Sequence, residues 1–325
     1  MIRTGALFAV AAICAAGACG DNKSLGLSWG LGVATFPVTT VGITAVPAAA
    51  DAPAWLATIS DTPHLETPTY DHEDQVTHPD ILVEPDRVLL AVTPYPYSND
   101  ADENPSLLVG RDGIGFRPLP GAPDPLVPPP PIDHNDDPDL RRVAPGSDYE
   151  LLYLETERPA KQTVVALRSP DLRTWTRRDA IVYDLAANDE FIVSPAAILD
   201  DAGVTHLFYV WLASDNRIMA LTSPDGTTWD RATELAATLP LGDVIPWHLD
   251  VIRAGAGYAM LISGYVGADQ FDFQDLYLAT SPDLLTWTLR PEPLLRHGDL
   301  GVTSLYRSTG VVSGDRLVVW YAMQY

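Results

Sequence analysis

A short phrase that recurs three times constrains the fold of this chain more than any other feature. It reads SPDLRTW at Ser169–Trp175, SPDGTTW at Ser223–Trp229 and SPDLLTW at Ser281–Trp287. A weaker copy, GRDGIGF, lies at Gly110–Phe116, with Phe in place of Trp. The aromatic residues of successive copies are 59, 54 and 58 residues apart. A period of this length indicates a repeated supersecondary unit.

Each of the three full copies follows a run that is typical of a β-strand. The runs at 163–168, 217–222 and 275–280 are β-branched or aliphatic, too short for helices, and bounded by turn residues. Ser-Pro-Asp favours a turn, because Pro presets φ and the Ser and Asp side chains can bond nearby backbone N–H groups. The phrase therefore predicts a β-hairpin whose turn is held by its own side chains, with the Trp opening the next strand.

A second pattern recurs about thirty residues before each phrase, at 78–82, 137–140, 194–198 and 248–252, and another apolar run follows it each time. Each unit thus has four antiparallel strands. Four complete units and a truncated fifth predict an all-β fold, a five-bladed β-propeller. The truncated blade needs strands from elsewhere. We expect the apolar segment 25–46, with strand-like runs at 28–33 and 40–44, to close the ring.

The N-terminus has the pattern of a bacterial lipoprotein signal. Arg3 precedes an apolar run, and small residues lead to Cys19. This pattern predicts a signal peptide over residues 1–18 and lipidation at Cys19. We expect an extracytoplasmic protein, either a cell-envelope lipoprotein tethered to a membrane only by lipid or a secreted protein.

The remaining chain is interpreted as one propeller with an N-terminal approach. Residues 19–75 are assigned to a tether, the ring-closing strands and an irregular approach, and residues 76–325 to the five blades. The only cysteines are Cys14 and Cys19, so no disulfide and no thiolate metal site is expected beyond them.

The charge balance limits the partners. The chain has 20 Lys and Arg against 43 Asp and Glu, a formal net charge of −23. This disfavours nucleic acids and anionic membrane surfaces as partners. It fits a protein that handles neutral or cationic ligands, although a solvated acidic surface is the simpler and favoured explanation. We expect a monomer.

The polar loops gather on one rim of the predicted channel, where function is expected. Three aspartates recur there at equivalent places, Asp80, Asp139 and Asp250, whereas blade three has Ala196 with Glu190 upstream. Like charges in a partly buried funnel acquire different pKa values, which can provide one base and one acid. We predict Asp80, Asp139, Glu190 and Asp250 as catalytic carboxylates for glycosidic-bond cleavage.

Other residues on this rim are candidates for substrate binding. Aromatic side chains, including Tyr306 and Phe271, could stack on sugar rings, and Arg307 could hold a hydroxyl or a carboxylate. The predicted substrate-binding residues are His78, Tyr95, Tyr97, Glu103, Asn104, His134, Asn135, Glu155, Trp247, His248 and Arg307.

Simpler interpretations exist for these residues. An Asp near the start of a strand is often only an acceptor for backbone N–H groups, an explanation that three equivalent copies weaken. His78, His134 and His248 are interpreted as hydrogen-bonding rim residues rather than metal ligands. No metal and no cofactor is therefore predicted, and a central Ca²⁺ is left open.

The Ser-x-Asp-Leu-x-x-Trp phrase and the five units resemble the five-bladed β-propeller glycoside hydrolases of families 43, 62, 32 and 68. The resemblance covers most of the chain from His78 to Tyr325. Blade one, with TPYPYSN at 93–99 and ENPS at 103–106, also resembles a family of uncharacterised bacterial and phage propellers.

The family-43 resemblance implies an Asp base on blade one, an Asp on blade two that tunes pKa, and a Glu acid on blade three. Asp80 and Asp139 match the first two roles. Blade three reads Val193-Ser194-Pro195 where the family has Glu-Gly-Pro, so the acid would be Glu190, with Glu155, Glu103 and Asp250 as alternatives. His78 stands where the family has the leading Asp of blade one.

Together these observations predict a glycoside hydrolase with an oligo- or polysaccharide substrate. A furanose-containing or other cell-surface or plant polysaccharide, cleaved with inversion, is expected. The alternative is a non-catalytic glycan-binding surface lipoprotein of the same fold, which the missing blade-three Glu favours. A structural propeller module that binds protein is a third possibility.

Overall fold

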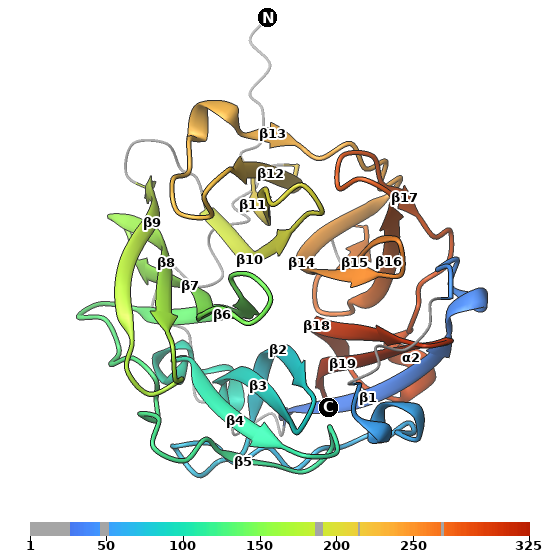
Figure 1. The fold of residues 1–325 in the computed structure, drawn as a ribbon, viewed down its shortest axis with the longest axis horizontal. Helices are drawn as coiled ribbons and strands as arrows, with labels where there is room; N and C mark the ends of the chain where they lie inside the picture. Colours follow the sequence, from blue (N-terminus) through green and yellow to red (C-terminus); the bar gives the residue numbers. More distant parts are fainter. Residues whose placement is uncertain (1–26, 46–51, 186–190, 214, 268–269) are drawn as a thin grey trace, which may run out of the picture.

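Five antiparallel sheets surround a central axis in the computed structural model, and the chain passes through them in order around the ring (Figure 1). The structure describes residues 27–45, 52–185, 191–213, 215–267 and 270–325. Four sheets have four strands each and the fifth has three. The predicted five-bladed β-propeller is therefore confirmed. The predicted signal peptide and Cys19 lie outside the described residues.

In blades one to four the strands follow one another outward from the axis in chain order (Figure 1). Blade one comprises β2 (Val76–Glu84), β3 (Arg87–Pro94), β4 (Ser106–Gly110) and β5 (Phe116–Pro118). Blade two comprises β6 (His134–Arg142), β7 (Tyr149–Glu157), β8 (Lys161–Ser169) and β9 (Thr176–Asp184). Blade three comprises β10 (Phe191–Leu199), β11 (Thr205–Leu212), β12 (Arg217–Ser223) and β13 (Leu235–Ala236). Blade four comprises β14 (Val244–Ala254), β15 (Gly257–Val266), β16 (Asp275–Ser281) and β17 (Thr288–Leu289). Blade five comprises β18 (Ser304–Ser313), β19 (Arg316–Gln324) and β1 (Trp29–Pro37).

The short helices of the described residues lie between these strands. They are η3 (Val38–Thr40), η4 (Ala54–Ala57), η5 (Pro96–Ser98), η6 (Asp100–Asp102), η7 (Arg231–Thr233) and α2 (His297–Leu300). No helix in this part of the chain is long and apolar enough to cross a membrane.

The two ends of the chain close the ring. Strand β1 pairs antiparallel with β19 along its whole length, and Figure 1 shows the two side by side. Beyond β1, Val33 and Thr62 exchange two backbone hydrogen bonds of 2.8 and 2.9 Å. The expected run at 40–44 forms no strand, because the chain turns through η3 after β1. The N-terminal segment therefore completes blade five as predicted. It supplies one strand, β1, and Thr62 pairs with the outer edge of that strand.

The repeated phrase forms turns held by its own side chains, as predicted. Oδ1 of Asp171, Asp225 and Asp283 accepts the backbone N–H groups two and three residues later, at 2.7–2.9 Å. Asp112 does the same in the weaker copy, at 3.0 and 2.9 Å. The phrase thus fastens the hairpins between the third and fourth strands.

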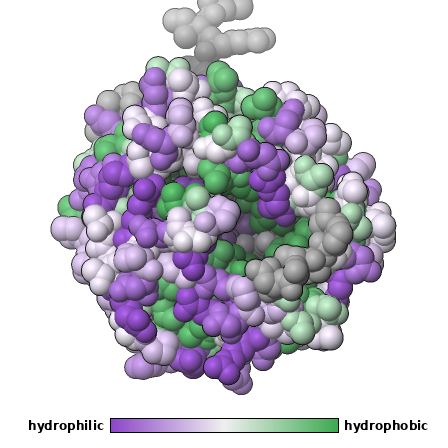
Figure 2. Space-filling view, viewed as in Figure 1, coloured by the Kyte–Doolittle hydropathy of each residue, from purple (hydrophilic) through white to green (hydrophobic). Residues whose placement is uncertain are grey.

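The hydrophobic core is divided among the blade interfaces. Each of five apolar clusters joins two neighbouring blades, including the interface between blades five and one. Trp287, 2% exposed, belongs to the cluster between blades three and four. Because the apolar residues are used between blades, polar residues of the inner strands are left to line the axis. The space-filling view shows the ring hollowed at its centre (Figure 2).

Candidate active site

Each inner strand carries an extra residue near the end where it begins. The pairing register shifts between Thr77 and Asp80 in β2, and at matching points in β6, β10, β14 and β18. In three blades the residue before proline, His78, Asp137 or Ser194, has a positive φ of 51–57°. Bulges bend a strand and redirect its side chains, and such φ values concentrate at functional sites.

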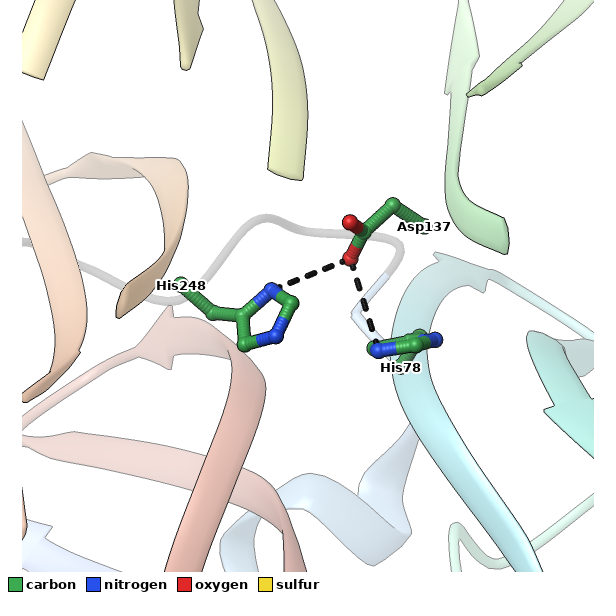
Figure 3. Close-up of side chains that lie close together, drawn as sticks. All are labelled: His78, Asp137 and His248. Atoms are coloured by element: carbon green, nitrogen blue, oxygen red, sulfur yellow. Dashed lines mark ion pairs between the residues drawn. The ribbon is translucent and has the colours of Figure 1, made fainter. Parts of the chain in front are cut away.

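His78, Asp137 and His248 form the first cluster, from blades one, two and four. The His248 Nδ1 atom lies 3.2 Å from Asp137 Oδ1, and the His78 Nε2 atom lies 3.7 Å from the same oxygen. Figure 3 shows the two imidazoles on either side of the carboxylate. All three side chains are buried. One carboxylate thus faces two imidazoles.

Two further residues hold Asp137 in place. The Ser194 N–H donates to Oδ2 at 2.8 Å, and the Ser194 hydroxyl donates to Oδ1 at 3.3 Å. Arg307, which has no exposed surface, places Nη1 3.3 Å from Oδ1. Blades three and five therefore orient the carboxylate that blade two supplies.

The electrostatic environment separates the protonation states of the first cluster. Burial opposes ionisation of Asp137, but His78, His248 and Arg307 outweigh it and hold the pKa of that carboxyl well below its usual range. Burial lowers the pKa of His78 to about 3, so this imidazole is neutral at physiological pH. An ionised carboxylate therefore lies beside an unprotonated imidazole.

This cluster has the donor set of a divalent metal site. The Nε2 atoms of His78 and His248 are buried and make no hydrogen bond within the described residues. One ligand atom from each of His78, Asp137 and His248 lies within 4.8 Å of the others. Neutral imidazole nitrogens and a carboxylate oxygen suit Zn²⁺ and related ions, and three protein ligands leave a position open for catalysis. The residues fit such an ion, which departs from the interpretation of these histidines as rim residues.

Glu103, His134 and Asp136 form a second cluster beside the first. The two oxygens of Glu103 lie 3.6 Å from His78 Nδ1 and 3.5 Å from His134 Nε2. His134 Nε2 lies 3.3 Å from Asp136, and its Nδ1 lies 2.6 Å from Asp133. The Glu103 carboxyl thus bridges the first cluster and a histidine surrounded by carboxylates.

The second cluster is arranged for proton transfer. Burial raises the pKa of Glu103 well above its usual range, although His134 opposes the effect. Burial disfavours the imidazolium of His134, but Asp136, Asp133 and Glu103 outweigh it and raise its pKa well above the ordinary value. A carboxyl with raised pKa and an adjacent imidazolium are suitable as general base and general acid.

Aromatic side chains surround the two clusters. The Tyr306 ring centroid lies 4.2 Å from that of His248 and 5.4 Å from that of His78. The half-buried Trp247 packs edge-on against Phe271, with centroids 4.6 Å apart. These rings provide apolar faces next to the buried polar groups.

Asp80, Asp139 and Asp250 form a separate group, and their carboxylate oxygens lie within 4.8 Å of one another. Asp80 accepts the Leu140 N–H, and Asp139 accepts the Ala197 N–H at 3.1 Å. Each of these two aspartates therefore joins its blade to the next. All three are at most 5% exposed. The oxygens are closer than the roughly 6.5–9.5 Å between the carboxyls of an inverting glycosidase, and the catalytic role of these residues stays a prediction.

Asp139→Asn is expected to stabilise the protein at alkaline pH and not at pH 4. Burial and the charge of Asp250 raise the pKa of Asp139 to about 7. The folded state therefore binds more protons than the unfolded chain between about pH 4 and 7, so stability falls as pH rises through this window. Asn keeps an acceptor for the Ala197 N–H without the charge.

The expected gain is about 1–4 kcal/mol at pH 8, measured by urea denaturation with a chelator present. The measurement at pH 4 is the control. An equal difference at both pH values would contradict the assignment.

The other residues predicted from the sequence do not gather in one cluster. Asn104 and Asn135 are buried beside the second cluster and share a 2.8 Å hydrogen bond. Tyr95 lies against Trp29, with ring centroids 5.5 Å apart. The remaining three are Tyr97, which donates to Glu73 at 3.1 Å, Glu155, which pairs with Arg177 at 2.7 Å, and Glu190, which lies outside the described residues.

The sequence interpretation missed Asp137, Asp136 and Ser194 as site residues. A signal for two of them was present, because the residue before proline recurs as His78-Pro79, Asp137-Pro138 and Ser194-Pro195. The prediction instead chose the third residue of the pattern, Asp80 or Asp139. The carboxylates of these two residues join neighbouring blades.

Comparison with known proteins adds a relative whose activity differs from glycosidic cleavage. No protein-family model matches the chain. The A type blood N-acetyl-α-D-galactosamine deacetylase of Flavonifractor plautii is 25% identical over 341 residues, covering 85% of this chain and 42% of that protein. The chain thus spans less than half the length of this relative.

Solved structures share the propeller fold. An N-acetylgalactosamine deacetylase from F. plautii, in complex with blood group B trisaccharide, has a TM-score of 0.65 and 20% identity, covering 87% of this chain and 95% of that one. A thermostable family-43 glycoside hydrolase has a TM-score of 0.58 and 13% identity, covering 77% and 88%. An exo-1,5-α-L-arabinanase from a bovine ruminal metagenomic library has a TM-score of 0.53 and 14% identity, covering 75% of this chain and 92% of that one. The resemblance to family-43 propellers is thus confirmed for the fold.

Proposed function

We propose that this protein is a metal-dependent hydrolase that removes acyl groups from amino sugars of a glycan. The observation that carries the proposal is the His78–Asp137–His248 cluster, in which two buried imidazole nitrogens without hydrogen bonds accompany an ionised carboxylate. The similarity to an N-acetylgalactosamine deacetylase supports the same class of reaction.

His78, Asp137 and His248 would hold the metal ion. When bound, a divalent ion supplies Lewis acidity that polarises an acyl carbonyl and lowers the pKa of water. Arg307 and Ser194 contribute by keeping the Asp137 carboxylate in one orientation.

Glu103 and His134 would move the protons of the reaction. As water adds to the acyl carbon, ionised Glu103 takes one of its protons. As the carbon–nitrogen bond breaks, the His134 imidazolium gives a proton to the departing amine. The 3.5 Å separation of these groups lets Glu103 return its proton to His134. The products are a carboxylic acid and a free amine, so atoms and charges balance.

The aromatic residues would bind the sugar. Trp247 and Phe271 present adjacent ring edges and faces near His248, and rings of this kind stack on the apolar faces of pyranoses. A neutral N-acetylhexosamine fits a rim whose charge is predominantly acidic, and the released amine becomes cationic when it takes up a proton from the acid product or from water.

Glycoside hydrolysis is the second candidate, because family-43 hydrolases share the fold. In that case Asp80, Asp139 and Asp250 would supply the carboxylates, acting with inversion on a furanose-containing polysaccharide. Three observations argue against this function. All three side chains are buried, their carboxylate oxygens lie close together, and Asp80 and Asp139 accept hydrogen bonds from backbone N–H groups. The extracytoplasmic, lipid-anchored location stays a prediction under either function.

An activity panel on the purified protein tests the proposal. The protein is stripped with a chelator and assayed with and without Zn²⁺ or Mn²⁺ on N-acetylgalactosaminides, N-acetylglucosaminides, arabinan and arabinofuranosides. Metal-dependent acetate release from an N-acetylhexosamine is expected. Metal-independent release of reducing sugar would favour the glycosidase, and glycan binding without turnover would favour the non-catalytic lipoprotein; either result overturns the proposal.

A further inference from the structure

Tyr306 lies in the bulge of β18, between Leu305 and Ser308, and contacts both histidines of the first cluster. Trp29 packs against its ring, with centroids 5.1 Å apart. The ring is therefore held beside His78 and His248 and has little room to reorient.

The Tyr306 hydroxyl accepts a hydrogen bond from Trp247 Nε1 at 3.0 Å. A phenol oxygen that accepts one hydrogen bond still has its own proton to donate. The structure shows no hydrogen bond from that proton to any of the described residues. The hydroxyl is therefore available as an O–H donor.

We propose that Tyr306 is a catalytic residue whose O–H stabilises the acyl oxygen as negative charge develops on it. This inference rests on the proposed deacylase function. When water adds to the acyl carbon, the C=O π pair moves to oxygen, and the Tyr306 O–H donates a hydrogen bond without losing its proton. When the carbon–nitrogen bond breaks, the pair returns to re-form the carbonyl, and the nitrogen takes its proton from His134.

Trp247 has a supporting part in this arrangement. Its N–H binds the phenol oxygen, which fixes the direction of the O–H bond and strengthens it as a donor, because hydrogen bonds in a chain polarise one another. Preorganised donors of this kind act where charge develops in the transition state.

Tyr306→Phe separates this role from a structural one, since Phe keeps the ring and its contacts and removes only the hydroxyl. We expect kcat on an N-acetylhexosaminide to fall about 10²–10³-fold, with KM and Zn²⁺ affinity changed less than about threefold. Tyr209→Phe is the matched control, because Tyr209 is buried in blade three and its hydroxyl makes no hydrogen bond within the described residues. Zn²⁺ affinity is measured by competition with a chromophoric chelator.

The outcomes distinguish the two proposals. If the wild type is active and Tyr306→Phe retains its kcat, the Tyr306 ring has only a structural packing role. This inference then fails while the deacylase function stands. If Tyr306→Phe loses Zn²⁺ affinity in parallel with kcat, the hydroxyl supports the metal site and the catalytic role is again overturned. If the wild type releases no acyl group from any amino sugar, the function fails and the role of Tyr306 fails with it.

Discussion

Asp137→Asn is expected to lower kcat/KM for acyl release by at least about 10²-fold and to weaken Zn²⁺ binding at least about tenfold, because even the partners of a metal ligand are worth about 10–100-fold. The Asn side chain has the same shape and can accept the Ser194 N–H. It lacks the negative charge that both histidines face, within 3.2 and 3.7 Å. The loss should therefore appear in metal affinity as well as in turnover.

Ser194→Ala is the matched control for this variant. It removes the hydroxyl that lies 3.3 Å from Asp137 and 2.8 Å from His248, and it keeps the backbone N–H that donates to Asp137. We expect a smaller loss than for Asp137→Asn, of about tenfold, because Ser194 orients a metal ligand and is not itself one. Titration with Zn²⁺ and steady-state kinetics measure both variants, with circular dichroism to verify folding. Full activity of Asp137→Asn would exclude the first cluster as the centre of the reaction.

Glu103→Gln is expected to lower kcat about 10²–10⁴-fold, because Gln cannot take a proton from water. Zn²⁺ affinity should change little, since Glu103 approaches the outer nitrogen of His78 at 3.6 Å rather than the Nε2 atom that faces Asp137. The pH profile should also change. Activity of the wild type is expected to fall with acidification at a pH above the ordinary pKa of Glu, and this limb should disappear in the variant.

Glu157→Gln provides the comparison, because Glu157 ends the second strand of blade two and its carboxylate pairs with Lys161 at 2.6 Å rather than with a residue of either cluster. Its kinetics should match the wild type. If Glu103→Gln also kept the wild-type kcat and acidic limb, the base would have to be another group.

The blade count could be predicted because the interactions that form each hairpin are local. Asp171, Asp225 and Asp283 bind backbone groups only two and three residues away, so the signal lies within one short phrase. The closure of blade five was also predictable, since an apolar segment without a blade remained at the N-terminus. The edge at Thr62 was not, because its pairing with Val33 depends on the position of an already folded β1.

The candidate site was predicted only in part. His78, Glu103, His134, His248 and Arg307 were all chosen as rim residues, and the structure brings them together. Asp137 was passed over for Asp139, two residues later. The bulge at Pro138 explains the difference, because the positive φ of Asp137 turns its side chain toward the histidines while Asp139 binds the backbone of blade three.

The sequence by itself determined the number of blades, their order and the rim on which polar residues gather, because period, turn chemistry and strand patterns are local properties of the chain. Only the tertiary structure decided which of the many acidic and histidine side chains meet. That choice depends on bulges in five separate strands and on distances between blades that lie about 60 to 170 residues apart in the chain, from His78–Asp137 to Asp137–Arg307. No periodicity in the sequence encodes those distances.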